Sequence, residues 1–249
     1  LHLSVLAGRA RPSRRTLRPE PVVLAVAAVA LLVLVVLPLA SLVWGSVSDE
    51  GGLTLQHFRE ALGRRLYLQA LWNSLILGAW TAVLSVAIGL PMAWAVGRTN
   101  IPAKGFVHGT ALVSYITPPY LTAIALVNLF GPNAGLVNRF VREILGLPAL
   151  TLNIFSMTGL VLVTVIHTFP FVYLLAARAL ESVDASMEES AQVLGAGRWR
   201  TAVRITAPLV APAIVSGALI AFVNAIAWIG SHAIIGLPRR NFTLPTPIN

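Results

Sequence analysis

The sequence predicts an all-α fold: a polytopic transmembrane helical bundle with about five spans. Of its 249 residues, 57% are hydrophobic and only 11% are charged, whereas a soluble domain carries about 25% charged residues. Five runs without Asp, Glu, Lys or Arg each hold an apolar stretch of about 20 residues, enough to cross ~30 Å of hydrocarbon. The remaining charges are therefore confined to the ends of spans and to the connections between them.

We predict the five spans near residues 21–43, 71–96, 106–130, 158–179 and 208–229. The first span is longer than the 7–15 residue apolar core of a secretory signal peptide, so we expect it to be retained. The intervening polar connections then divide the chain into a permanently membrane-embedded core and several short loops.

Residues 1–20 form a basic tail, which we interpret as a topology signal that contacts anionic lipid headgroups. With the N-terminus in the cytoplasm, eleven of the 18 Lys and Arg residues fall on the cytoplasmic side. This bias favours a cytoplasmic N-terminus. It also explains the net charge of +9 without nucleic acid as a partner.

Residues 44–70 form the first periplasmic segment, in which Asp49, Gly51 and Gly52 predict a turn. Helical spacing of apolar residues then predicts a short helix lying along the membrane surface, although a plain connector is the alternative. These apolar residues are Leu55, Phe58, Leu62 and Leu66.

Residues 71–230 form the predicted core, interrupted by a Gly/Pro/Asn-rich turn at 131–138. A short amphipathic segment is expected to begin at Asn138. Residues 231–249 read as a periplasmic loop, because five spans with the N-terminus inside leave the C-terminus outside. We expect the native polypeptide to continue past Asn249 into a further span, so that the sequence is a truncation.

The sequence offers no basis for an enzyme. It has no Cys, which excludes disulfides and thiolate metal sites. Its single lysine, Lys104, lies in Ile-Pro-Ala-Lys-Gly-Phe, which is not a phosphate-binding loop. Neither a G-x-S-x-G elbow nor an H-E-x-x-H zinc motif is present. We therefore expect no cofactor or metal bound by this chain.

The stretch 184–208 is the polar, charged interruption of an otherwise apolar chain. Asp184 or Ser186 is expected to cap a helix, and Ser186 with Glu189 fits a capping box. That helix would run to Leu194, reverse at Gly195, and continue as a second helix into the last span. The alternative is an amphipathic loop that lies in the interface between two spans.

The spacing of this stretch resembles the EAA loop of binding-protein-dependent ABC importer permeases. The matching residues are Glu189, Ala191, Gly195, Ile205 and Pro208, with departures at Ser190, where Ala is usual, and Ala207, where Leu is usual. The resemblance implies that this loop docks onto cytoplasmic ATPase subunits, which bind the ATP and Mg.

Three further stretches resemble the iron(III)-type branch of the family: Thr117–Tyr120, Leu129–Asn138 and His167–Phe171. The resemblance implies a bacterial inner-membrane protein that receives substrate from a periplasmic binding protein. A second permease unit would complete the pathway, as a homodimer, a heterodimer or a fused half. Iron(III) is the expected substrate, with thiamine, a polyamine or an aminophosphonate as alternatives.

Polar or helix-breaking residues within the spans are candidates for a translocation pathway. Adjacent prolines should kink the third span and free backbone carbonyls. A packing kink, and hydrogen bonds between helices, are the alternatives. His167 lacks the partners for a metal cage. The candidates are Pro118, Pro119, Asn128, His167, Asn224 and Trp228.

Two other classes of function fit the sequence less well. An ion-gradient-driven secondary transporter or channel should carry buried ionisable residues for coupling, yet the five predicted spans contain no acidic residue. A non-transporting membrane assembly subunit would need no loop built as a helix, a sharp turn and a second helix.

Overall fold

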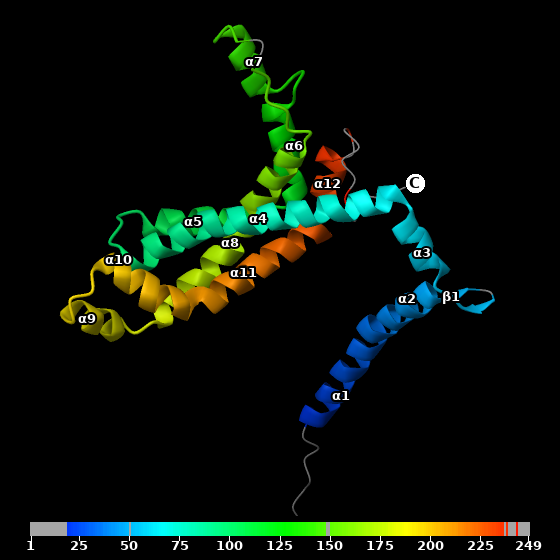
Figure 1. The fold of residues 1–249 in the computed structure, drawn as a ribbon, viewed down its shortest axis with the longest axis horizontal. Coiled ribbons are helices and arrows are strands. Elements are labelled where there is room, and N and C mark those ends of the chain that lie inside the picture. The colour runs from blue at the N-terminus through cyan, green and yellow to red at the C-terminus, as the bar shows by residue number, and fades with distance from the viewer. Residues whose placement is uncertain (1–18, 50, 148–149, 237, 239–242, 244–249) are drawn as a thin grey trace, which may run out of the picture. The chain divides into compact units, whose positions relative to one another are not determined.

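The computed structural model describes residues 19–49, 51–147, 150–236, 238 and 243 (Figure 1). Among them, four helices are long and apolar enough to cross a membrane, or five if one bent pair counts as a span. The predicted all-α membrane fold is confirmed. The chain divides into two compact units, residues 1–63 and 64–249, which are described separately below.

The first unit is built on a single long apolar helix. It comprises α1 (Pro19–Leu31), the π-helical turn η1 (Leu32–Val36) and α2 (Leu37–Val47). The side chains of residues 21–45 are all exposed, as expected for a helix that faces lipid. The wider π turn lies just before Pro38, which has no N–H to donate to the preceding turn.

A tight hairpin and a short helix follow this span. The strands β1 (Ser48–Asp49) and β2 (Gly52–Leu53) pair antiparallel, and Gly52 has a φ of 116°. Helix α3 (Gln56–Gly63) then carries Phe58 and Leu62, both exposed. The predicted turn and short helix are therefore confirmed, although Leu66 belongs to the next helix.

Three long helices form the core of the second unit: α4 (Arg65–Arg98), α8 (Met157–Ser182) and α11 (Ala207–Ala227). They lie side by side in Figure 1. In the most apolar part of α8, 72% of the residues are buried. The corresponding shares are 28% for α4 and 22% for the α11 span. Helix α8 is thus the central helix, and its neighbours cover it.

Small residues let the neighbours approach α8 closely. A Cβ atom on Gly89 of α4 would lie 2.8 Å from the backbone oxygen of Phe169, and one on Gly217 of α11 would lie 2.8 Å from the Cα of Val172. In lipid, where no hydrophobic force draws helices together, such contact supplies the packing energy. A buried hydrogen bond of 2.8 Å between the Ser85 and Thr168 hydroxyls joins α4 to α8 as well.

The third predicted span, 106–130, is not one kinked helix. It consists of α5 (Lys104–Ile116) and α6 (Pro119–Phe130), which meet at 100°. Thr117 and Pro118 precede prolines, and both adopt extended backbone with ψ of 126° and 133°. Two consecutive extended residues change the helix direction far more than a single proline kink would. Helix α5 packs along α8.

Helix α6 leads into the predicted turn, which occupies residues 131–135, and then into α7 (Leu136–Glu143), which begins two residues before the predicted start at Asn138. The buried Asn138 side chain cross-links this region: its Nδ2 donates to the oxygens of Gly131 and Leu152, and its Oδ1 accepts from the Leu152 amide. The segment therefore holds its shape through polar contacts rather than through a large core.

The last span ends slightly earlier than predicted, at Ala227. The segment predicted as a loop from residue 231 begins with the short helix α12 (Gly230–Ile235), which contacts α6 and α8. Most of the remainder of that predicted loop lies outside the described residues.

The close approach of α4 to α8 at Gly89 can be tested by its effect on stability. Gly89→Ala should lower the free energy of unfolding by about 1–3 kcal/mol, because the new methyl group overpacks the contact with α8. Gly97→Ala, on the same helix, is the control, since its Cβ would meet Leu180 at an ordinary 3.5 Å. Thermal unfolding in detergent measures both. Equal stability of the two variants would contradict the packing argument.

Candidate functional site

The segment between α8 and α11 forms two short helices joined by a sharp turn. Helix α8 ends at Ser182, and the Asp184 side chain caps α9 (Ala185–Val193) by accepting a 2.9 Å hydrogen bond from the Ser186 amide. That hydrogen bond lowers the pKa of Asp184. Asp184 is therefore the cap, and the predicted capping box between Ser186 and Glu189 is not formed.

The turn after α9 depends on Gly195. Its φ of 86° lies in the left-handed region that favours glycine. The Gly195 amide donates to Gln192 and the Ala196 amide to Ala191, both at 2.9 Å, which is the hydrogen-bond pattern of a Schellman helix end. Helix α10 (Arg198–Thr201) then begins the return.

The return helix runs without a break into the membrane. Helix α10 continues through the π turn η2 (Ala202–Thr206) into α11. As in the first unit, the π turn precedes a proline, here Pro208, which lacks an N–H. The helix–turn–helix predicted for 184–208 is therefore present, and its second arm is continuous with the span.

The tip of this loop exposes apolar side chains. Val193, Leu194 and Trp199 are 87%, 88% and 82% exposed. Beneath the tip lies a groove of about 360 Å³. Its lining residues are Ala191, Leu194, Ala196, Arg200, Thr201, Arg204 and Ile205. An exposed apolar tip above a basic groove is the composition expected of a surface that binds a protein partner.

The predicted loop residues occupy different parts of this surface. Ala191 and Ile205 are half-buried and line the groove, Gly195 makes the turn, and Glu189 and Pro208 are exposed. Glu189 is thus exposed and forms no side-chain hydrogen bond or ion pair with the other described residues.

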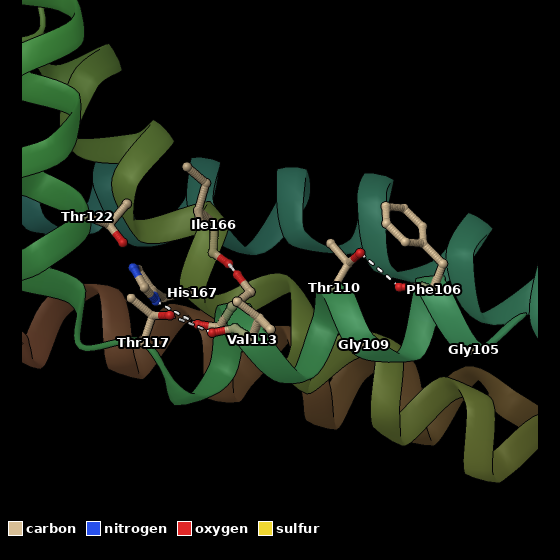
Figure 2. Close-up of a pocket in the computed structure, with 10 residues that line it drawn as sticks. Gly105, Phe106, Gly109, Thr110, Val113, Thr117, Thr122, Ile166 and His167 are labelled. Carbon is tan, nitrogen blue, oxygen red and sulfur yellow. Dashed lines mark hydrogen bonds between the residues drawn. The ribbon is translucent and has the colours of Figure 1, made fainter. Parts of the chain in front are cut away.

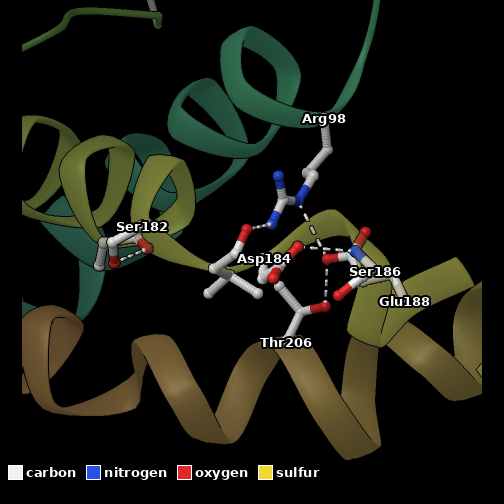
Figure 3. Close-up of polar contacts among 8 residues, drawn as sticks. Arg98, Ser182, Asp184, Ser186, Glu188 and Thr206 are labelled. Atoms are coloured by element: carbon white, nitrogen blue, oxygen red, sulfur yellow. Dashed lines mark hydrogen bonds and ion pairs between the residues drawn. The ribbon is translucent and has the colours of Figure 1, made fainter. Parts of the chain in front are cut away.

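Sequence reasoning missed the contact that holds the base of the loop. The Glu188 carboxylate forms an ion pair with Arg98, the last residue of α4, with Nε and Oε1 3.0 Å apart. The Thr206 hydroxyl donates to the same oxygen at 2.7 Å (Figure 3). No local pattern links residues 98, 188 and 206, so only the folded structure reveals them.

A second polar feature lies beside α5 and α8. A groove of about 690 Å³ is lined by hydroxyls and a buried histidine (Figure 2). Its lining residues are Gly105, Phe106, Gly109, Thr110, Val113, Ser114, Thr117, Thr122, Ile166 and His167. No Asp or Glu is among these residues, so the groove is a mostly apolar surface with a few hydroxyls and no negative charge.

Pro170 accounts for the hydrogen bonds that join α5 to α8 beside this groove. Because proline has no N–H, it leaves the carbonyl of Ile166, four residues earlier, without its helical donor. The Ser114 hydroxyl donates to that carbonyl instead. In return, the His167 ring bonds through Nδ1 to the Ser114 carbonyl at 2.9 Å. A carbonyl only accepts, so Nδ1 carries the proton.

The other ring nitrogen of His167 is then an acceptor when the ring is neutral. It is buried and has no partner among the described residues. The Trp228 ring packs edge-on against the imidazole, with centroids 6.0 Å apart. The structure therefore brings together two of the predicted pathway residues, His167 and Trp228.

The remaining pathway candidates are elsewhere. Pro118 and Pro119 form the break between α5 and α6 beside the groove, rather than lining it. Asn128 is exposed on α6, and the Asn224 amide donates to the Ile220 carbonyl of its own helix at 2.9 Å. Neither asparagine meets the His167 groove. Within the described residues, no cluster of three or more His, Asp or Glu side chains is placed to hold a metal.

Comparison with known families identifies the chain. Residues 85–240 match the family described as the binding-protein-dependent transport system inner membrane component. The chain belongs to this family. The matched region begins on α4, includes α8 and α11, and contains the whole 184–208 loop. Membership of a family of membrane permease subunits agrees with the absence of enzyme motifs.

Three relatives are similar to this permease over most of its length. The putative ABC transporter permease protein ORF1 of Streptomyces antibioticus is 37% identical over 172 residues, which cover 69% of this chain and 67% of the relative. The molybdenum transport system permease ModB of Escherichia coli is 28% identical over 181 residues, covering 70% and 77%. A probable sulfate permease, cysT of Chlorokybus atmophyticus, is 26% identical over 220 residues, covering 88% and 73%.

A solved structure shares the fold. A bacterial ABC transporter involved in the import of alginate superposes with a TM-score of 0.68 at 20% identity, covering 90% of this chain and 79% of that one. The three sequence relatives are a molybdenum permease, a sulfate permease and one without a stated substrate. The predicted iron(III) branch therefore finds no support in them.

The exchange of hydrogen bonds around Pro170 can be tested. Ser114→Ala should lower the free energy of unfolding by about 1–3 kcal/mol, because the Ile166 carbonyl is left without a donor. In a Pro170→Ala background the N–H of residue 170 is restored and donates to that carbonyl. The same Ser114→Ala substitution should then lower the free energy of unfolding by less. Thr110→Ala is the control, since its hydroxyl bonds only to its own helix at Phe106. Unfolding in detergent gives the values, and an equal cost in both backgrounds would contradict the argument.

Proposed function

We propose that this chain is a permease subunit of an ATP-driven importer and that the 184–208 loop transmits movement from a separate ATPase. The observation that carries the proposal is the loop itself, in a chain of this family. A capped helix, a left-handed glycine turn and a return helix continuous with a span make a stiff lever. Its apolar tip is exposed and suited to a protein groove.

The orientation follows from the same loop. Arg98 and Lys104 bracket the connection from α4 to α5, and Arg98 contacts the 184–208 loop. These connections therefore share one side of the membrane, and the bias of basic residues makes that side the cytoplasm. These observations support the proposal of a cytoplasmic N-terminus in the bacterial inner membrane.

Substrate would pass along the groove at His167, at the surface that a second permease unit completes. Four hydroxyls and an imidazole give this wall weak, neutral hydrogen-bonding groups, which suit passage rather than tight capture. Pro118 and Pro119 form the break beside it, and Trp228 supports the histidine ring. A periplasmic binding protein would deliver the substrate, as the alginate transporter's complex with its periplasmic protein illustrates.

The substrate class that we propose is a tetrahedral oxyanion such as molybdate or sulfate. Two of the relatives are permeases for molybdenum and for sulfate. The groove residues agree with this class: ferric ion prefers carboxylate and other hard anionic ligands, and none lines the groove. The hydroxyls of Thr110, Ser114 and Thr117 already donate to backbone carbonyls, whereas the Thr122 hydroxyl makes no such bond among the described residues and can donate to an anionic oxygen.

Two substitutions test the lever. Gly195→Pro should reduce transport to background and weaken ATPase attachment, because proline cannot adopt a φ of 86°. Glu189→Lys should do the same by reversing a charge that faces the partner. Co-purification of the ATPase and uptake into vesicles are the measurements, with membrane insertion checked in parallel.

Each substitution has a matched control. Gly197→Ala should be tolerated, since Gly197 has a φ of −67° and open space around a new Cβ. Glu181→Lys makes the same charge change on an exposed residue outside the loop. If Gly195→Pro and Glu189→Lys both transport normally, the loop is only a connector.

The substrate proposal is tested in vesicles that hold this chain, its ATPase and a second permease unit. Addition of a loaded binding protein should raise ATP hydrolysis several-fold, and molybdate or sulfate should accumulate inside. The chain alone should hydrolyse no ATP. Accumulation of ferric ion without either oxyanion would overturn the substrate class, and ATP hydrolysis by the isolated chain would overturn the division of labour between subunits.

A further inference from the structure

The base of the 184–208 loop is held at one carboxylate where three elements converge. Arg98 ends α4, Glu188 lies in the first half of α9, and Thr206 ends η2 at the start of α11. The Thr206 hydroxyl donates a 2.7 Å hydrogen bond to Oε1 of Glu188, and Nε of Arg98 lies 3.0 Å from the same oxygen, an ion pair without hydrogen-bond geometry. Figure 3 shows the two side chains approaching the carboxylate from opposite sides. We refer to Arg98, Glu188 and Thr206 as the base cluster.

The base cluster is shielded from water, unlike the other ion pairs of the described residues. The Arg98 and Glu188 side chains are 17% and 19% exposed, and Thr206 is fully buried. The pairs Arg139–Glu143 and Arg178–Glu181 are instead more than half exposed on both sides. Exposed pairs contribute little and are screened by salt, whereas a partly buried pair is screened much less and is costly to break by removing one partner.

The cluster also holds the connection that leads into α9. The Arg98 guanidinium donates through Nη2 to the Val183 carbonyl at 3.4 Å. Val183 is the extended residue that ends α8, next to the Asp184 cap. Arg98 therefore contacts both the joint before α9 and the helix itself.

Outside the base cluster, α9 makes few polar contacts with the long helices. In the described part of the chain, no other side-chain hydrogen bond or ion pair joins α9 to α4. Helix α9 packs mainly against α10 and η2, which belong to the same loop. Within these residues, the polar connection from α9 to α4 is therefore the one between Glu188 and Arg98.

We propose that the base cluster is the mechanical connection that makes α9 move as one body with α4 and α11, so that Arg98, Glu188 and Thr206 are positioning residues for coupled transport. The proposal deepens the proposed function and rests on it. A helix is stiff along its length, so displacement of Arg98 is carried into the region of α4 that packs on α8 at Gly89. Without the cluster, α9 would still bind a partner and contact the return helix that leads into α11, but its movement would no longer be carried into α4.

Glu188→Gln is the central test, because it keeps the shape and the acceptor for Thr206 while removing the charge that pairs with Arg98. We expect ATPase attachment to be retained and ATP hydrolysis to continue. The amount of substrate imported per ATP should fall about fivefold or more, the lower range of coupling between sites. Glu181→Gln is the control: it removes an exposed pair of the same kind and should change nothing.

Two further variants test the same connection if the Glu188→Gln protein is unstable. The exchange Arg98→Glu with Glu188→Arg should restore at least half of the lost coupling, because it reverses the pair without removing it. Arg98→Lys should import less substrate per ATP than the unaltered protein, because an ammonium lacks the guanidinium fork that reaches both Glu188 and the Val183 carbonyl.

A distance measurement separates positioning from general stability. The chain contains no Cys, so single cysteines can carry spin labels at exposed positions, such as Val193 on the loop and Trp80 on α4. The distance distribution should be narrow in the unaltered protein and broad in Glu188→Gln. It should stay narrow in Glu181→Gln, with the unfolding temperature of all three alike.

The outcomes distinguish this inference from the proposed function. If Glu188→Gln imports as much substrate per ATP as the unaltered protein, or keeps the narrow distribution, the base cluster is not the connection. If the unaltered protein attaches no ATPase, the proposed function fails, while the distance measurement still tests whether the cluster holds α9 to α4.

Discussion

The packing of α8 against its two neighbours is the constraint on which the rest of the core depends. In lipid, neither solvent nor a hydrophobic force holds helices together, so contact distance determines how much each pair gains. Gly89 and Gly217 bring α4 and α11 within van der Waals contact of the α8 backbone around Phe169 and Val172. The most buried helix is therefore the one whose neighbours have the least side chain at the crossing.

The same region of α8 contains a backbone carbonyl that needs a hydrogen-bond donor from another helix. Pro170 withdraws a backbone donor at membrane depth, where an unsatisfied carbonyl is costly. Ser114 of α5 supplies the donor, and its own carbonyl accepts from His167. The hydrogen bonds between Ser114 of α5 and α8 thus follow from one proline in α8. A break in the regular hydrogen bonding of a central helix is answered by a side chain of the helix that packs beside it.

The sequence was sufficient for features that depend on local pattern. The apolar runs predicted the spans, and Asp184, Gly195 and the basic return helix predicted the lever, because caps and left-handed turns are local events. The sequence was not sufficient for features that depend on several residues acting together or on residues far apart in the chain. The pair Pro118 and Pro119 suggested a kink, yet two successive extended residues produce a turn of 100°. A long-range pair such as Arg98 with Glu188 has no local signature, and adjacent Glu188 and Glu189 are equivalent until the helix packs.

Those two adjacent glutamates show how the loop divides its tasks. Neighbouring residues of a helix point about 100° apart, so only one of them can face the bundle. Glu188 faces Arg98 and is shielded, while Glu189 is exposed. A chain with few charges thus places one carboxylate at the base of the loop and leaves the next one exposed on its surface. The apolar tip at Leu194 and Trp199 lies beyond both. In the function that we propose, attachment and transmission depend on different residues of one short loop, so that binding at the tip acts on the spans through the base.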